Sequence, residues 1–316
     1  MFARRSPSVW ILALLVVTRA AWADLDVVGD KLVLNAWVRV GAYGWRAENA
    51  GLARNQFAFE RVSGVAALTG RPSSLVSLKL SGDVSYLQPQ DLYVDLRWSS
   101  GLGLRAGQFL LPLGFDAMTE PDSQVLASKS FVASFAKSTG TRDIGVVGSY
   151  GVGRLAASAA VVNGSGANTW DNNDLKDLCG RVSVIPFPSL DAVLALRAHY
   201  GWPDVSDSLW RTAALEARVR VGRLTLQAEY QDQISASART NTTYLQAVWD
   251  NGTLAWVGRF DLDLPRGMHP HWMIDGGVNV RPRDGNFRLM LDCSYNRDYQ
   301  GNWAVLGFGV GLQAEL

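Results

Sequence analysis

The stretch DLYVDLRWSSGLGLRAGQFLLPLGFD, residues 91–116, decides the fold. Its first part indicates two strands with alternating polar and apolar residues, joined by a tight turn at Ser99-Ser100-Gly101. Regular structure then stops from residue 110 to residue 141, and a loop of this length in a compact domain is usually functional or disordered. Its apolar side chains, Phe115 and Phe131 among them, favour an ordered loop. We therefore predict that residues 110–141 fold into the interior of a large β-barrel and narrow it.

The alternation seen in this stretch recurs along the rest of the chain. In RLTLQAEYQDQ, residues 223–233, Leu226 and Tyr230 lie on one side of a strand, and Gln227 and Glu229 lie on the other. No long amphipathic helix is predicted. The pattern predicts sixteen strands, at 32–44, 56–69, 74–84, 91–99, 102–109, 142–150, 153–163, 176–186, 190–201, 209–221, 223–233, 242–249, 253–262, 271–281, 286–296 and 301–316.

The connections between these strands alternate in length. Short turns carry Gly, Pro or Asp-Gly, which are typical of hairpins. An even number of strands, with short turns on one rim and long loops on the other, is typical of an outer-membrane barrel. An all-β soluble protein with many short strands is the alternative. The longer loops are predicted at 45–55, 85–90, 110–141, 164–175, 202–208, 234–241 and 263–270, followed by a short last loop near 297–300.

The two faces of the strands need opposite surroundings. In a transmembrane barrel of sixteen strands the apolar face meets lipid and the polar face meets a wet interior. Closure into a ring also satisfies every backbone hydrogen bond, as lipid requires. Aromatic residues near the strand ends are candidates for interfacial girdles, namely Trp37, Trp98, Trp249, Trp256, Tyr200 and Tyr230.

The first residues have the features of an export signal. Arg4 and Arg5 precede a short apolar run, and Ala21-Trp22-Ala23 forms a cleavage site, which predicts a signal peptide over 1–23 and a mature barrel over 24–316. Without Arg4, Arg5 and Arg19, the 30 Lys and Arg of the whole chain become 27 against 29 Asp and Glu, so the mature chain is near neutral and slightly acidic. This balance excludes the concentrated basic surface that nucleic-acid binding needs. Localisation in a bacterial outer membrane, in contact with its lipids, is expected.

Three segments of the chain resemble one known family. They are DLYVDLRWSSGLGLRAGQFLLPLGF, RDIGVVGSYG and VVNGSGANTWDNNDLKDLCGRVSVIPF, at 91–115, 142–151 and 161–187. In this order they resemble the phosphate-selective porin O and P family; the later half of the chain matches mainly in its strand pattern. The resemblance implies an outer-membrane porin, a homotrimer, and a pore lined by arginine and lysine side chains that pass anions.

The basic side chains that would line such a pore come from the loop and the strands. The loop supplies Lys129 and Lys137, with Arg142 at its end. Strand alternation places Lys79, Arg97, Arg105, Arg181, Arg218 and Arg220 inside, together with Arg197, Arg223, Arg259, Arg281 and Arg288. Acidic residues on the same faces nearly balance them: Asp83, Asp91, Asp95, Asp177, Asp191, Glu216, Glu229, Asp261, Asp275 and Asp292, with Asp116, Glu120 and Asp122 in the loop.

This balance favours passive diffusion of small hydrophilic solutes, with anions such as phosphate among them, over a strong phosphate filter. A plugged structural or adhesive barrel is the alternative, and an outer-membrane enzyme is a weaker one. No catalytic, cofactor or metal site is predicted, because a serine hydrolase needs a histidine base with an orienting partner, and no G-x-S-x-G motif is present. Alternation places Cys179 and Cys293 on opposite faces of distant strands, which predicts two free thiols.

Overall fold

The computed structural model describes residues 25–26, 31–49, 52–59, 63–137, 140–171, 173–187, 189–202, 209–235, 238–282, 286–297 and 304–315. The predicted signal peptide, residues 1–23, lies outside the described residues and stays a prediction. The strands are β1 (Leu25–Asp26), β2 (Leu32–Asn49), β3 (Leu52–Phe59), β4 (Ser63–Gly70), β5 (Val76–Asp83), β6 (Gln88–Arg97), β7 (Leu102–Leu110), β8 (Arg142–Val152), β9 (Leu155–Val162), β10 (Asp177–Val184), β11 (Asp191–Gly201), β12 (Trp210–Val221), β13 (Leu224–Ile234), β14 (Arg239–Asp250), β15 (Leu254–Pro265), β16 (His271–Val280), β17 (Phe287–Arg297) and β18 (Ala304–Glu315).

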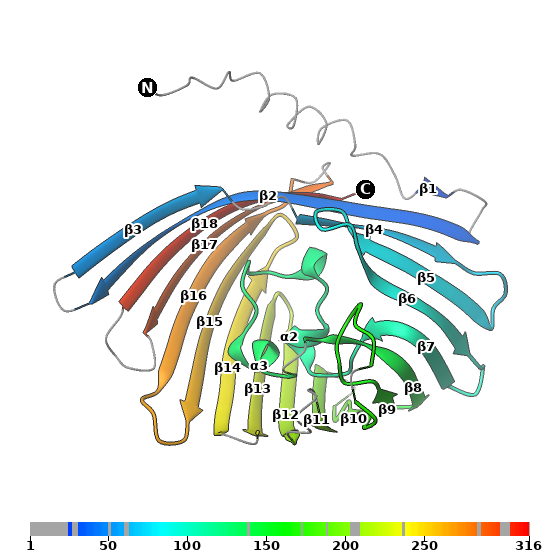
Figure 1. The fold of residues 1–316 in the computed structure, drawn as a ribbon. Helices are drawn as coiled ribbons and strands as arrows, with labels where there is room; N and C mark the ends of the chain where they lie inside the picture. Colours follow the sequence, from blue (N-terminus) through cyan, green and yellow to red (C-terminus); the bar gives the residue numbers. More distant parts are fainter. Residues whose placement is uncertain are drawn as a thin grey trace.

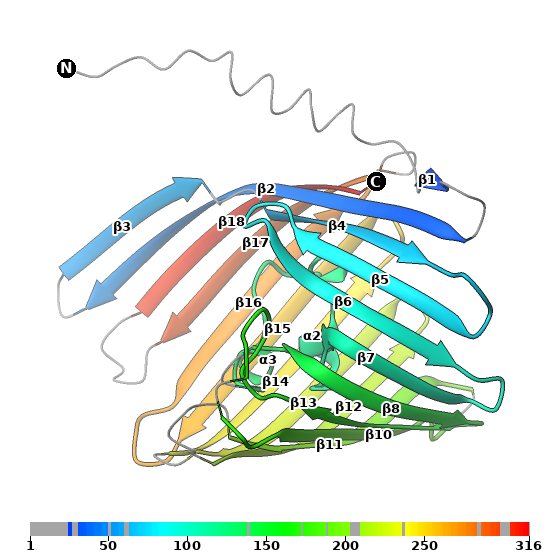
Figure 2. The ribbon, with the colours of Figure 1, turned by 45° about the vertical axis from the view of Figure 1, so that its right-hand side comes forward.

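The strands form one closed antiparallel ring (Figures 1 and 2). From β4 to β18, each strand pairs with the next strand in the sequence, and the ring closes where β18 pairs with β2 along most of its length. The long β2 pairs with β3 through its second half and with β4 through its first half, so β3 and β4 share one position in the ring. Within the described residues, β2 to β18 therefore make a barrel of sixteen strand positions, as the alternation predicts.

The described helices all lie in the loop between β7 and β8. They are α2 (Phe115–Met118), the 3-10 turn η1 (Pro121–Ser123) and α3 (Phe131–Ser134). In the part of the chain that the structure describes, no helix has the length and apolar character needed to cross a lipid bilayer.

The barrel is apolar outside and polar inside. On β13, Leu226 and Tyr230 are exposed on the outer surface, whereas Glu229 and Gln231 between and beside them are buried. The other strands follow the same rule, because side chains two apart share a face. Exposed Trp98, Trp249, Trp256, Tyr200 and Tyr230 are on the outside, as predicted. Trp37 is the exception: it is only 8% exposed and points to the interior.

Several predicted loops are shorter than expected because the strands continue past the change in composition. β2 extends to Asn49 through the predicted loop 45–55. β6 begins at Gln88, so the connection from β5 is short. Pro89 enters this strand because the β5–β6 register shifts between Leu80 and Gly82, and Pro89 pairs with Gly82 beside this irregularity.

Candidate functional site

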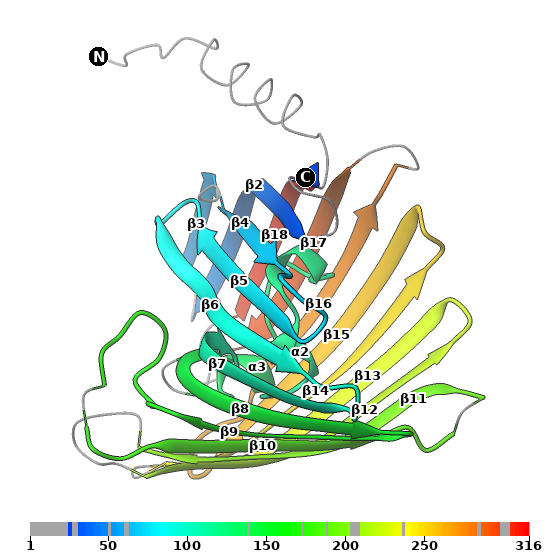
Figure 3. The ribbon, with the colours of Figure 1, turned by 90° about the vertical axis from the view of Figure 1, so that its right-hand side faces the viewer.

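The loop of residues 110–141 lies inside the barrel, and α2 and α3 are seen within the ring of strands in all views (Figure 3). Its backbone is hydrogen-bonded to inward-facing side chains of distant strands. The N–H of Asp116 donates to Glu229 Oε1 (3.0 Å), and the N–H of Phe131 donates to Asp261 Oδ1 (2.9 Å). The loop therefore runs against β13 to β18, which we call the loop-bearing wall.

Neighbouring residues hold Glu229 in position to accept the hydrogen bond from Asp116. It is buried and accepts a second hydrogen bond from the hydroxyl of Tyr244 on β14 (2.5 Å). Gly114 lies directly beside it with a φ of 112°, and a Cβ at this position would lie 2.2 Å from Glu229 Oε2. Glycine is therefore required where the loop first touches the wall.

Arg259 on β15 joins the loop to two carboxylates. Its guanidinium lies 2.7 Å from Asp261 Oδ2 and 2.6 Å from Asp275 Oδ2. The same guanidinium donates to the backbone carbonyls of Ser128 (2.9 Å) and Lys129 (3.2 Å). Arg259 is only 3% exposed, so a buried ion-pair cluster holds the loop in one position.

Three further side chains of this wall hold the loop before that cluster. Asn279 Nδ2 donates to the carbonyl of Val125 (2.7 Å). Arg288 (2.6 Å) and Gln313 (3.0 Å) both donate to the carbonyl of Asp122. Polar side chains of the strands thus replace the backbone partners that an irregular buried segment lacks.

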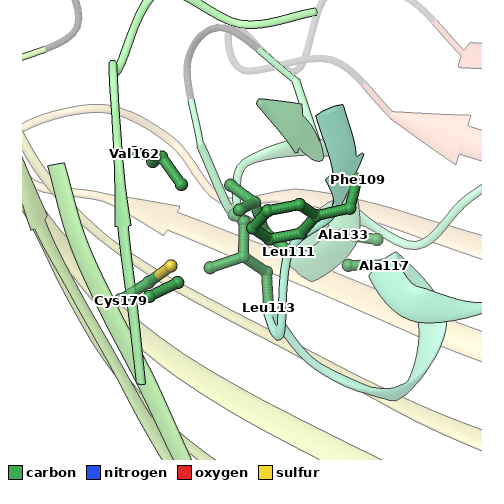
Figure 4. Close-up of a cluster of buried hydrophobic side chains, with 9 residues drawn as sticks. Phe109, Leu111, Leu113, Ala117, Ala133, Val162 and Cys179 are labelled. Atoms are coloured by element: carbon green, nitrogen blue, oxygen red, sulfur yellow. The ribbon is translucent and has the colours of Figure 1, made fainter. Parts of the chain in front are cut away.

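The base of the loop packs on the opposite part of the ring. Leu111 and Leu113 are fully buried against Phe109, Val162 and Cys179 (Figure 4). This apolar cluster fixes both the start of the loop and the strands β9 and β10 beside it.

Lys137 lies fully buried near this cluster and not on a pore surface, which corrects the prediction from the sequence. Its Nζ lies 2.8 Å from Asp143 Oδ2, 3.8 Å from Asp177 Oδ2 and 2.8 Å from the carbonyl of Gly164. Asp177 in turn contacts His199 Nε2 (3.0 Å). A buried ammonium group needs carboxylates and hydrogen-bond acceptors around it, and these contacts make Lys137 an anchor of the loop.

Lys129 is also engaged within the loop. Its Nζ donates to the carbonyls of Asp116 and Thr119, both at 2.6 Å. Burial lowers the pKa of Lys129 from its ordinary value, and the nearby charges of Asp116 and Glu120 act in the opposite direction. The side chain closes the loop on itself and is only partly accessible.

A cavity of about 350 Å³ remains between the loop and the facing strands β2, β4, β5 and β6, which we call the open wall. Glu120 and Asp122 border it from the loop. From the open wall come Asn35, Trp37, Lys79, Ser81, Gln90 and Asp91, with small apolar residues between them. We call this cavity the aperture.

Lys79 and Arg142 are the two predicted basic residues that the structure brings together at the aperture. Lys79 Nζ lies 2.8 Å from Asp91 Oδ2 and 3.8 Å from a Glu120 oxygen. Arg142 lies 2.9 Å from Asp91 Oδ1 and 2.7 Å from Glu120 Oε2. The four side chains form a closed group with two positive and two negative charges.

Arg97 and Arg105, two other predicted basic residues, contact a different carboxylate. Arg97 and Arg105 share Asp95 at 2.8 and 3.3 Å, and Arg105 also lies 4.1 Å above the ring of Tyr93. Arg97 is largely exposed. These two arginines line the interior nearer the short turns that follow β6.

A third arginine group surrounds the first residue of α2. Arg181 and Arg218 each lie 5.1 Å from the ring of Phe115, a distance at which a cation attracts an aromatic face. Arg181 is paired with Glu216 at 2.8 Å. Arg220 is exposed and donates to the carbonyl of Gly222 (3.4 Å), close to the β12–β13 turn. The predicted basic set is thus divided among several places in the interior.

The uncharged residues that border the aperture do not stand out in the sequence. The sequence analysis predicts Trp37 in an interfacial girdle, whereas it borders the aperture together with Asn35 and Ser81. The sequence did not show that β2 and β4 face the free side of the loop.

Two further predictions concern side-chain chemistry. Cys179 is buried and Cys293 is exposed, and both are free, which confirms the prediction of two free thiols. Among the described residues, no group of three or more His, Cys, Asp or Glu side chains is placed to hold a metal ion.

Known structures share this architecture. OprB of Pseudomonas putida has a TM-score of 0.69 and 9% identity, with 90% of this chain and 94% of that one covered. An anion-selective porin from Comamonas acidovorans has 0.63 and 14%, covering 90% and 100%. The trimer form of OmpT, an outer membrane protein of Vibrio cholerae, has 0.62 and 8%, covering 91% and 100%. No protein-family model and no curated protein sequence matches the chain. The chain thus has the porin fold, and the resemblance to the phosphate-selective family stays a prediction.

Proposed function

We propose that this protein is a porin of a bacterial outer membrane, through which small hydrophilic solutes diffuse passively. The observation that carries the proposal is the combination of an apolar outer surface, a polar interior and an inward loop that leaves an aperture on one side. A loop of this kind sets the pore size, and the side chains around it set the field that a solute meets.

Anions such as phosphate are among the solutes expected to pass, without a strong filter for them. Rings of basic side chains select anions. Here Lys79 and Arg142 are matched by Asp91 and Glu120, and Lys137 is buried. An excess of positive charge is expected nearer the short turns, where Arg97 and Arg105 share one carboxylate.

A homotrimer is part of the proposal. Support comes from the trimer form of the Vibrio cholerae protein, which has the same fold. Crosslinking of the folded protein in detergent, followed by mass determination, tests this state.

The function is tested by adding the refolded protein to a planar lipid bilayer in KCl. Stepwise increases of current are the expected result. A correctly folded barrel that gives no steps would contradict the porin proposal and favour a plugged structural barrel. In the same experiment, a block of the current by low phosphate concentrations would show a phosphate site that the charge balance does not predict.

A further inference from the structure

We propose that the aperture prefers neutral, hydroxyl-rich solutes of monosaccharide size over anions and cations of the same size. This inference rests on the proposed porin function and names the solute class that its narrow part favours.

The first argument is that the charged side chains of the aperture are already paired with one another. Asp91 is held by both Lys79 (2.8 Å) and Arg142 (2.9 Å), and Glu120 is held by Arg142 (2.7 Å). A charged solute loses part of its hydration in a narrow passage and recovers it only where an uncompensated opposite charge is available. The closed group of four offers no such charge.

Asp122, the remaining ionised residue of the lining, does not change this balance. Its Oδ1 is buried, and its backbone carbonyl accepts a hydrogen bond from the guanidinium of Arg288 (2.6 Å). The guanidinium of Arg288 therefore lies beside the backbone of Asp122. Counted with Lys79 and Arg142, it makes three positive charges around the aperture, against the three carboxylates Asp91, Glu120 and Asp122.

The second argument is the number of uncharged hydrogen-bonding groups. Asn35, Gln90 and Asn286 border the cavity and carry side-chain amides. The hydroxyl of Ser81 is buried and accepts a hydrogen bond from the N–H of Asp91 (3.0 Å). An amide offers both donors and acceptors, as does a hydroxyl, so these groups match the hydroxyls of a sugar or polyol in either direction. An anion would use only the donors.

The third argument is size and shape. The volume of about 350 Å³ lies at the lower end of the range of about 300–1,000 Å³ for small-molecule sites. Ala36, Val65 and Ala67 give the lining small apolar surfaces between the polar groups. Such surfaces suit the C–H faces of a sugar ring.

The test compares three solutes with the same carbon skeleton. The refolded protein is reconstituted into liposomes in buffered KCl, and the release of radiolabelled glucose, gluconate and protonated glucosamine is measured. Glucose is expected to leave fastest. The Glu120→Gln variant removes one negative charge from the aperture and should raise gluconate release by about fivefold, the factor expected from one unit charge at about 4 Å in water. The ratio of gluconate release to glucose release is compared between this variant and the wild type.

The matched control is Asp232→Asn. Asp232 is also paired with an arginine, Arg239 at 2.8 Å, but Tyr230 two residues away is on the outer surface, so the pair lies on the outside of the barrel. This variant should behave as the wild type. Gluconate or glucosamine release as fast as that of glucose, in a protein that conducts KCl, would overturn the inference and leave the porin function intact. Absence of KCl conductance would overturn both.

Discussion

The strands of the loop-bearing wall and of the open wall alternate polar and apolar residues in the same way, but their inward polar side chains have different roles. On the loop-bearing wall, Arg259, Asn279 and Glu229 are buried and form hydrogen bonds with the loop backbone. On the open wall, Lys79 and Ser81 border a cavity. A polar side chain that points into the barrel therefore does not necessarily line the pore. Their role depends on whether the loop covers them.

Replacement of Arg259 on the loop-bearing wall is expected to have the largest effect on stability and conductance. Arg259→Met leaves Asp261 and Asp275 buried together without their cation, and frees two loop carbonyls. Loss of one partner of a buried ion pair costs about 3–5 kcal/mol of unfolding free energy. Urea unfolding of the barrel in lipid vesicles would measure the loss, and single-channel conductance should rise as the loop leaves the wall.

The matched variant is Arg97→Met, since the side chain of Arg97 is 73% exposed. Its pair with Asp95 is solvent-exposed on the arginine side, and such pairs contribute about 0–1 kcal/mol. Equal urea midpoints for the two variants would show that the loop is not held by the wall as described.

A smaller effect is expected from Asn279→Ala. Asn279 is 1% exposed and donates to the carbonyl of Val125, so the variant leaves a buried acceptor without its donor. This costs about 1–3 kcal/mol. The urea midpoint should fall, and the open-channel current should become noisier.

Asn286→Ala provides the comparison on the other side, because Asn286 is exposed and borders the aperture. Its loss should leave the urea midpoint unchanged. A fall as large as that of the Asn279 variant would mean that the two sides of the interior are held in the same way.

The smallest structural effect and a clear functional one are expected from Lys79→Met. Asp91 keeps Arg142, so the loss of stability should be smaller than in the Arg259 variant, where two carboxylates lose their cation. The aperture gains one net negative charge, which favours K⁺ and disfavours Cl⁻ by about fivefold each, so the permeability ratio of K⁺ to Cl⁻ should rise by about 25-fold. The zero-current potential in a KCl gradient measures this ratio.

Lys176→Met is the control for the lysine variant. Lys176 is paired with Asp171 in the connection between β9 and β10 and does not border the aperture. Its loss should not shift the zero-current potential. The shifts from Lys79→Met and Glu120→Gln should have opposite signs; shifts of the same sign would contradict the closed group of four charges.

The strands around the aperture are easier to predict from the sequence than the individual side chains that border it. Alternation and loop position are visible along the chain, and they predict that Lys79 and Arg142 face the interior. The same reasoning predicts Lys137 on the pore surface, because a lysine in an inward loop has the right charge. Its burial against Asp143 and near Asp177 depends on how the base of the loop packs, which alternation does not encode.

The sequence by itself determined the sixteen strand positions and their facing, because the two-residue period is a local property of each strand. Only the tertiary structure decided which wall binds the loop and which stays open. Glu229 and Asp116 are 113 residues apart in the chain, and Gln313 and Asp122 are 191 apart. Ring closure brings such pairs together, and the hydrogen bonds that they form settle which polar side chains remain for a solute.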